Sequence, residues 1–310
     1  MELEEEKKIL HKQGYAIVGR HSAVKPCHWL RQSLLYGTQC YKHTFYGIES
    51  HRCLQMTPTA FHCNQRCLYC WRYQAFPLAA FPKDMADEPS YICEESIKAQ
   101  KRLLSGYKGD ARVDIKKWEE ALQPKHVACS LIGEPTLYPY LDQFFEECHK
   151  RGMTTFLVTN GTMPEVLEKM DTLPTQLYVS ITAPNEEIYQ KLNNPLIKHG
   201  WERINKTLEL LPSLNTRTVI RHTLVKGWNL GYEEQYAKLI EKAEPWFVEP
   251  KGYVYVGYSR ERLTMENMPS HDEIKKFASR LAELTGYEIE DERADSRVVL
   301  LGRGKKRMIK

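Results

Sequence analysis

The chain has 310 residues with a formal net charge of +4, a hydrophobic content of 42% and a charged content of 27%. These values are those of an ordinary soluble protein, and the length is enough for one large core. The first eight residues are too charged for a signal peptide, and no apolar run approaches the length of a membrane span. We therefore expect a cytoplasmic protein that does not enter a membrane.

Residues 1–52 are predicted to form an N-terminal extension, helical at first and irregular around its cysteines. Residues 20–52 interleave Arg, Lys and His with Tyr, Trp and Phe, and the far end of the chain, residues 302–310, is strongly basic. Such a mixture can bind phosphates and stack on unpaired bases. It is equally typical of a solvated surface with a frayed terminus, and composition leaves both interpretations open.

A first strand is predicted over residues 53–61, and a loop with the spacing C-x3-C-x2-C follows it at Cys63, Cys67 and Cys70. A cubane iron–sulfur cluster has four irons, so three cysteines leave one iron open, as a reactive metal site requires. A zinc knuckle with an outside ligand such as His62 is the alternative, although zinc loops more often contain a second C-x2-C pair. The spacing resembles that of the radical S-adenosylmethionine superfamily, which implies a [4Fe-4S] cluster that binds S-adenosyl-L-methionine.

Strand-like and helix-like segments alternate after this loop. Apolar, β-branched stretches occur at 125–132, 154–159, 176–182, 216–225 and 247–256. Amphipathic runs occur at 94–104, 140–150, 165–170, 186–192, 201–211, 232–243 and 271–284, and a long loop is expected over 76–89. This alternation predicts an α/β fold with a parallel sheet and helices outside. With the superfamily resemblance, we expect a partial TIM-type (β/α)6 barrel over residues 53–310, preceded by the extension of residues 1–52 that carries cysteines.

Polar residues stand at the predicted strand ends, where a barrel of this kind binds its cofactor. Gly133 and Glu134 resemble the superfamily's Gly-Gly-Glu element, which receives the methionine amino group, although Ile132 replaces the first glycine. Tyr69 matches the position whose backbone meets adenine in the superfamily. Further candidates for cofactor binding, each of which could equally be a capping or turn residue, are Asn160, Ser180, Thr182, Arg221 and Thr223.

Three more cysteines, Cys27, Cys40 and Cys53, have long spacings, and three unrelated buried thiols would explain them equally well. Together with the loop cysteines they make six, which is enough for two clusters of three. A second open iron could hold two oxygens of a bound substrate. Lys42 stands two residues after Cys40, and a lysine near a cationic or dry site can form a Schiff base with a carbonyl compound. An ordinary solvated lysine is the alternative.

Six motifs together resemble the tRNA 4-demethylwyosine synthase family, over residues 20–300. They are CYK at 40–42, FYGIESHR at 45–52, CNQRCLYCWR at 63–72, EALQPKHV at 120–127, GEPTLYPYL at 133–141 and KGYVYVGYS at 251–259. The resemblance implies that the loop cysteines bind the cluster that cleaves S-adenosyl-L-methionine. It also implies that the three long-spaced cysteines bind a second [4Fe-4S] cluster and that Lys42 is the Schiff-base lysine for pyruvate.

The same resemblance implies the substrate. The family acts on tRNA(Phe) that carries N1-methylguanosine beside the anticodon, and it adds two carbons of pyruvate to form the tricyclic 4-demethylwyosine base. The shorter members lack a flavodoxin-like domain, which implies a separate electron donor such as flavodoxin or ferredoxin. Because the reacting methyl group lies on a base edge, we expect the base to be flipped out of the anticodon stack.

Two alternatives remain at this point. Another radical enzyme with an auxiliary cluster, such as a peptide maturase, would keep both sets of cysteines but would give Lys42 and the basic tail no role. A zinc-bearing RNA-binding protein without catalytic activity would keep the basic and aromatic residues. Iron content after anaerobic reconstitution separates these from the two-cluster enzyme.

Overall fold

The computed structural model describes residues 2–74 and 79–309. Within these ranges, ten strands form one sheet in the order β1-β2-β3-β4-β5-β6-β7-β8-β10-β9. Six consecutive strands of this sheet are parallel: β3 (Cys53–Thr57), β4 (His126–Cys129), β5 (Thr154–Thr159), β6 (Gln176–Ser180), β7 (Arg217–Leu224) and β8 (Phe247–Gly252). The predicted α/β fold with a partial (β/α)6 barrel is therefore confirmed.

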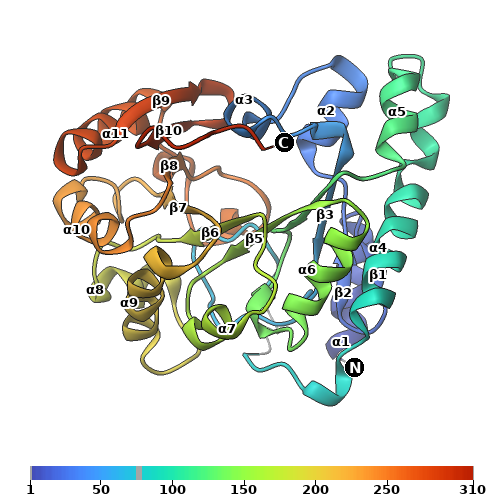
Figure 1. The fold of residues 1–310 in the computed structure, drawn as a ribbon, viewed down its shortest axis with the longest axis horizontal. Helices are drawn as coiled ribbons and strands as arrows, with labels where there is room; N and C mark the ends of the chain where they lie inside the picture. Colours follow the sequence, from blue (N-terminus) through green and yellow to red (C-terminus); the bar gives the residue numbers. More distant parts are fainter. Residues whose placement is uncertain (1, 75–78, 310) are drawn as a thin grey trace.

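Helices follow the parallel strands and cover the outer face of the sheet (Figure 1). They are α4 (Pro89–Leu104), α6 (Leu141–Lys150), α7 (Pro164–Lys169), α8 (Glu186–Ile188), α9 (Gly200–Leu210), α10 (Glu233–Ala243) and α11 (His271–Thr285), whereas α5 (Ile115–Ala121) packs in a separate cluster with Leu30 and Leu104. Their apolar faces, with residues such as Phe144, Leu208 and Phe277, pack on outward-facing strand residues to form the largest core cluster. Among the described helices, none is both long enough and apolar enough to cross a membrane.

Four antiparallel strands at the two edges of the sheet were not predicted. β1 (Ala16–Val18) and β2 (Ser22–Val24) add to β3, while β10 (Val298–Gly302) lies between β8 and β9 (Glu288–Arg293). The first two have three residues each, too few to show an alternating pattern, and β9 reads as charged surface. The division of the chain at residue 52 stays a prediction.

The segment between the cysteine loop and α4 is described only in part. The loop predicted over 76–89 includes residues 76–78, which lie outside the described residues. From residue 79 the chain forms one short turn at Lys83–Met85 and then enters α4.

The inner face of the sheet is covered by the N-terminal part of the chain. Three helices precede β3: α1 (Glu2–Lys12), α2 (His28–Tyr36) and α3 (Tyr41–Tyr46). Residues of α3 pack with inward-facing side chains of β5 to β8, and this second cluster includes Phe45, Phe156, Tyr178 and Phe247. The segment that carries Cys40 and Lys42 is thus part of the packed interior.

The basic C-terminal tail lies against α3, as Figure 1 shows near the C-terminus. Ile309 N–H donates to the Tyr46 carbonyl at 2.9 Å. The Arg307 guanidinium donates to the Phe45 carbonyl at 3.3 Å and the Thr44 carbonyl at 3.1 Å. These contacts fix the described part of the tail, so it is not frayed.

Candidate functional site

The three loop cysteines lie around one cavity at the C-terminal ends of the parallel strands. The cavity has a volume of about 1000 Å³, part of it open to solvent, and Cys63, Cys67 and Cys70 all line it. All three thiols are half-buried and free of disulfide bonds. Burial raises the pKa of Cys63 to about 11 and raises that of Cys67 further, so both are protonated until a metal takes the place of the proton. Three converging thiols fit a cluster with one open iron.

The glycine–glutamate element supports the cysteine loop directly. Gly133 has a φ of +77°, and a Cβ at this position would lie 1.8 Å from the Thr59 carbonyl oxygen. Glu134 N–H donates to the His62 carbonyl at 2.9 Å, next to Cys63. The close approach of these two backbone segments therefore requires glycine at this position.

Glu134 itself is a buried carboxylate that faces the cavity. Its Oε1 accepts from the hydroxyls of Thr136 and Thr159, each at 2.6 Å, and its Oε2 accepts from the Asn160 backbone N–H at 2.8 Å. Burial raises the pKa of Glu134 above its usual value, while these hydrogen bonds act in the opposite direction. Asn160 also lines the cavity and donates through Nδ2 to Asn64 Oδ1 at 2.7 Å. Glu134 and Asn160 are thus held rigidly at the cavity wall.

The other predicted cofactor contacts fall into two groups. Tyr69 and Ser180 line the cavity, and Thr182 lies behind Tyr69, whose hydroxyl donates to Thr182 Oγ1 at 2.9 Å. Among the described residues, Arg221 and Thr223 are not part of the cavity wall. Arg221 instead lies under α3, and the Thr223 carbonyl accepts from Asn229 Nδ2 at 2.8 Å.

Asn193 is a site residue that the sequence did not reveal. Its Nδ2 donates to Thr182 Oγ1 at 2.7 Å and lies 3.9 Å from Cys67 Sγ. The helix predicted over 186–192 breaks at Tyr189–Asn193 into a π-helical turn, which brings Asn193 to this place. Such turns are frequent at functional sites, but periodicity alone does not show them.

The three long-spaced cysteines come together beneath α3. Cys27 is the N-cap of α2 and accepts from Leu30 N–H at 3.2 Å, Cys40 is the N-cap of α3, and Cys53 begins β3. All three are half-buried. Burial raises the pKa of Cys27 to about 11, and the neighbouring Cys40 raises it as well. Burial, with smaller contributions from Cys27 and Cys40, raises the pKa of Cys53, so the three thiols are close enough to act on one another. Their convergence fits a second cluster.

Lys42 points from α3 into the interior. Its Nζ lies 4.5 Å from the Tyr178 ring centroid and 5.1 Å from that of Phe156. Burial and the nearby Arg221 lower the pKa of Lys42, which favours the neutral, nucleophilic amine. A partly buried amine beside a cation is one that can form a Schiff base with a carbonyl compound.

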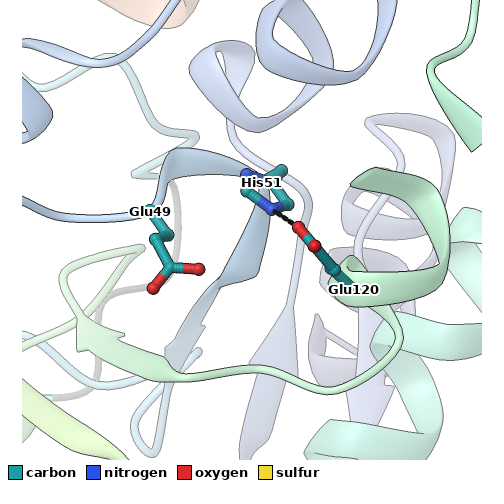
Figure 2. A group of neighbouring side chains, drawn as sticks. All are labelled: Glu49, His51 and Glu120. Carbon is teal, nitrogen blue, oxygen red and sulfur yellow. Dashed lines mark hydrogen bonds and ion pairs between the residues drawn. The ribbon is translucent and has the colours of Figure 1, made fainter. Parts of the chain in front are cut away.

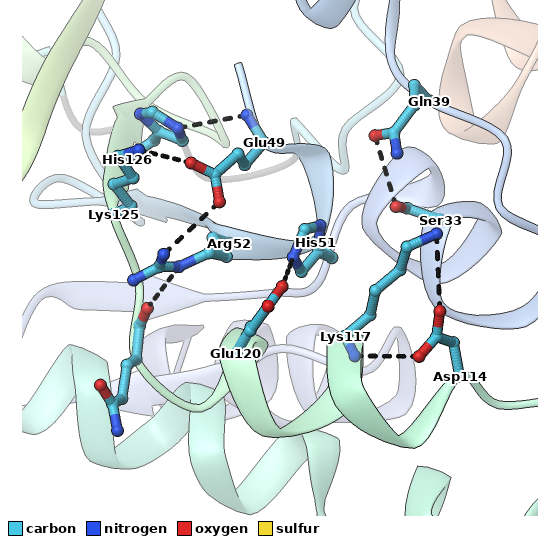
Figure 3. Close-up of polar contacts among 11 residues, drawn as sticks. Ser33, Gln39, Glu49, His51, Arg52, Asp114, Lys117, Glu120, Lys125 and His126 are labelled. Carbon is cyan, nitrogen blue, oxygen red and sulfur yellow. Dashed lines mark hydrogen bonds and ion pairs between the residues drawn. The ribbon is translucent and has the colours of Figure 1, made fainter. Parts of the chain in front are cut away.

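A polar network holds the segment before Cys53, and it joins two of the motifs (Figure 3). Glu49 pairs with Lys125 and with Arg52, and its backbone N–H donates to His126 Nε2 at 3.2 Å. His51 pairs with Glu120 at 2.6 Å. These bonds fix the chain just before β3 and so help to place Cys53.

Part of this network, Glu49, His51 and Glu120, has the composition of a metal site (Figure 2). However, Lys125 and Arg52 already neutralise Glu49, and the ring of His51 already bonds to Glu120. The arrangement is explained by these ion pairs.

A partial (β/α)6 barrel with three cysteines after its first parallel strand, facing a cavity at the strand ends, defines a radical S-adenosylmethionine enzyme. Accordingly, residues 57–240 match the radical SAM superfamily, and residues 242–303 match the family described as Wyosine base formation. The chain belongs to the S-adenosyl-L-methionine-dependent tRNA 4-demethylwyosine synthases, radical enzymes that form the wyosine base in tRNA and use S-adenosyl-L-methionine and a [4Fe-4S] cluster.

Full-length relatives support this assignment. The synthase of Pyrococcus abyssi (strain GE5 / Orsay) is 59% identical over 97% of this chain and 89% of its own length. That of Methanocaldococcus jannaschii is 45% identical over 96% of each chain. Among solved structures, TYW1 with a lysine-pyruvate adduct bound is 44% identical with a TM-score of 0.89, covering 99% of this chain and 97% of the other. An archaeal TYW1 crystal structure is 41% identical with a TM-score of 0.82, covering 99% of each chain.

Proposed function

We propose that this enzyme condenses N1-methylguanosine of tRNA(Phe) with pyruvate, and that it does so with two [4Fe-4S] clusters and Lys42. Cys63, Cys67 and Cys70 would hold the first cluster, which, when bound, supplies the electron that cleaves S-adenosyl-L-methionine. The three cysteines beneath α3 would hold the second cluster near pyruvate. The carboxylate of Glu134 accepts a hydrogen bond from the ammonium group of the cofactor.

The other predicted contacts have distinct roles in this proposal. Asn160 and Ser180 offer hydrogen bonds to the cofactor at the cavity wall. Thr182 acts through Tyr69, because its Oγ1 accepts a hydrogen bond from the tyrosine hydroxyl. This bond fixes the loop whose backbone would meet adenine. Arg221 and Thr223 would not contact the cofactor, and we assign Arg221 to the surroundings of Lys42.

Lys42 is proposed to form an imine with pyruvate. Its neutral amine attacks the keto carbon, the keto oxygen leaves as water, and a carbon–nitrogen double bond remains. A TYW1 structure, 44% identical to this chain, contains a lysine-pyruvate adduct, which supports the assignment. Burial and the nearby Arg221 lower the pKa of Lys42, which increases the neutral fraction of the amine, and burial limits competing water.

One observation carries this proposal: a single face of β6 reaches both the surroundings of Lys42 and the cavity of the loop cysteines. Tyr178 of β6 contacts Lys42, and Ser180 of the same strand lines the cavity of the loop cysteines. Residues two apart on a strand face the same way and are about 7 Å apart. Val158 of β5 likewise lines the cavity and packs against the cluster around α3. A substrate base in the barrel would therefore lie between the cofactor and the pyruvate adduct.

Two further parts of the proposal concern partners. The proposed electron donor is a separate protein such as flavodoxin or ferredoxin. The tRNA substrate favours the cytoplasm as the place of action.

The test is one reaction. Reduced, reconstituted protein is incubated with S-adenosyl-L-methionine, pyruvate and N1-methylated tRNA(Phe), and the tricyclic base is identified by mass. Borohydride should trap pyruvate on the parent protein at Lys42, and Lys42→Ala should abolish both trapping and product. Lys150→Ala, which removes an exposed lysine paired with Glu146 and Glu147, is the control and should retain both. Trapping that persists in Lys42→Ala would remove this residue from the mechanism.

A further inference from the structure

A buried carboxylate on β8 holds the helix that carries Lys42. The side chain of Glu249 is fully buried, and its Oε1 accepts from the Tyr46 hydroxyl at 2.6 Å. Its Oε2 accepts from the Tyr41 hydroxyl and from Arg221 Nε, each at 3.1 Å. A buried charge is tolerated only when it is paired and hydrogen-bonded in this way.

The two tyrosines are the first and last residues of α3, and Lys42 lies between them. A helix of six residues has little stability of its own, so its position depends on contacts with the rest of the protein. Both ends of α3 are bonded to the same carboxylate, that of Glu249.

Arg221 connects the same carboxylate to the surroundings of Lys42. Its Nη2 donates to the Tyr41 hydroxyl at 2.7 Å, and its guanidinium lies 4.3 Å from the Tyr178 ring centroid. The Nζ of Lys42 lies 4.5 Å from the same ring. The bonds of Glu249 therefore fix both the helix that carries the amine and the cation that lies beside it.

We propose that Glu249 is a positioning residue for the reaction of Lys42 with pyruvate. It holds α3 at the depth in the barrel at which Nζ meets the keto carbon of the substrate. This rests on the proposed function, because it takes Lys42 as the residue that forms the imine. Reacting atoms must come within about 3.5 Å, and a displacement of about 1 Å can lower a rate by roughly 100-fold.

The experiment removes one bond at a time from this arrangement in the reconstituted enzyme. Tyr46→Phe deletes a single buried hydroxyl at the end of α3. Its matched control is Tyr287→Phe, which also deletes a buried hydroxyl. That hydroxyl donates to the Pro245 carbonyl, and Tyr287 belongs to the outer core cluster rather than to the cluster around α3. Borohydride trapping by mass is measured against pyruvate concentration. We expect Tyr46→Phe to need roughly tenfold more pyruvate for half-maximal trapping and Glu249→Gln more still, with Tyr287→Phe equal to the parent.

A second readout separates positioning from general loss of structure. Reductive cleavage of S-adenosyl-L-methionine without pyruvate or tRNA uses the loop cysteines and should stay within about twofold of the parent in every folded variant. In turnover, the KM for pyruvate should rise more than kcat falls. The proposal would be overturned if folded Tyr46→Phe and Glu249→Gln reached half-maximal trapping at the same pyruvate concentration as the parent.

Failure of the proposed function would look different. In that case the parent itself would fail to trap pyruvate at Lys42, or Lys42→Ala would still trap it. If Glu249→Gln does not fold, Tyr41→Phe takes its place, because it removes the bonds that the Tyr41 hydroxyl makes with Glu249 and Arg221 at the other end of α3. Normal trapping in both tyrosine variants then overturns the inference.

Discussion

A side chain is accepted at residue 132 and excluded at residue 133, and the structure shows why. Ile132 takes the place of a first glycine, but its side chain is buried among Phe61 and Leu131, where there is room for it. Gly133 instead touches the backbone that leads to Cys63. The departure from the expected motif therefore leaves the contact between this element and the cysteine loop intact, since only the glycine at 133 is required by that contact.

Gly133→Ala should damage the first cluster site. The new Cβ would meet the carbonyl oxygens of Thr59 and His62, and the positive φ adds strain of about 1–3 kcal/mol. We expect a lower melting temperature and less reductive cleavage of S-adenosyl-L-methionine. Gly106→Ala is the control, because nothing lies within 4 Å of its added Cβ. Equal cleavage by the two variants would show that the close approach is unimportant.

The three cysteines beneath α3 determine the iron content that we expect of the reconstituted protein. If they hold a second cluster, the reconstituted parent should contain about eight irons per protein, and Cys27→Ser should contain about four. Cys129→Ser alters a thiol buried in the outer core and should keep the parent's value. The second cluster is ruled out if the parent contains about four irons and Cys27→Ser leaves that number unchanged.

At the scale of the element, β7 shows how one strand serves two faces of the sheet. Arg221 points inward to Glu249, and the next residue, His222, points outward under α10 and α11. The Nδ1–H of His222 donates to the Ile181 carbonyl at 2.7 Å, while its Nε2 is buried with no hydrogen-bond partner among the described residues. Burial lowers the pKa of His222 to about 4.

This shift predicts a loss of stability in acid. An unfolded histidine has a pKa of about 6.5, so between pH 6.5 and 4 the unfolded chain binds a proton that the folded protein does not. His222 makes its full contribution to the free energy of unfolding above pH 6.5. This contribution falls by about 3 kcal/mol as the pH drops to 4. Urea unfolding at pH 7.5 and pH 5 should show a smaller pH dependence for His222→Phe than for the parent. His199→Ala, which removes an exposed histidine, should behave as the parent. Equal pH dependence in the parent and His222→Phe would contradict the assignment.

The sequence predicted the parallel strands well because each is an apolar run that ends in polar residues. The loop cysteines were predicted from their C-x3-C-x2-C spacing, and Glu134 from its place beside a glycine at a predicted strand end. Glu249 was not predicted, because its partners Tyr41 and Tyr46 lie 208 and 203 positions away. The one available signal was a charged residue at 249, followed by another at 251, on the inward side of an otherwise buried strand. Arg221 was assigned to the cofactor because a sequence does not show which of two neighbouring sites a strand residue faces.

At the scale of the whole molecule, the C-terminal tail returns to α3, more than 260 positions earlier in the chain. Composition left the basic tail as either an RNA contact or a solvated end. The structure distinguishes its residues: Arg307 bonds to α3 and to β9, whereas Lys305 and Lys306 are exposed. Lys305 and Lys306 are therefore available to phosphates, whereas the Arg307 guanidinium is already bonded.

We therefore expect substitutions in the tail to have different effects: one at Arg307 should change stability, and one at Lys306 should change tRNA binding. Arg307→Ala should lower the free energy of unfolding by about 2 kcal/mol, because charge-assisted bonds to three backbone carbonyls are lost. Lys306→Ala should leave unfolding unchanged and weaken tRNA binding slightly, with a smaller salt dependence. Thermal unfolding and binding titrations at two salt concentrations check both. A normal melting temperature for Arg307→Ala would show that the tail contributes nothing to the position of α3.

The docking of the tail on α3 also determines when the enzyme becomes complete during folding. The bonds from Arg307 to the Phe45 and Thr44 carbonyls join residues 262 and 263 positions apart. Contacts of such high sequence separation form slowly and late, because the loop between them must close first. The helix with Lys42 is synthesised long before residue 307, and it receives these two contacts only once that residue has been made. Until then, the Phe45 and Thr44 carbonyls at the end of α3 lack the charged donor that they have in the folded protein.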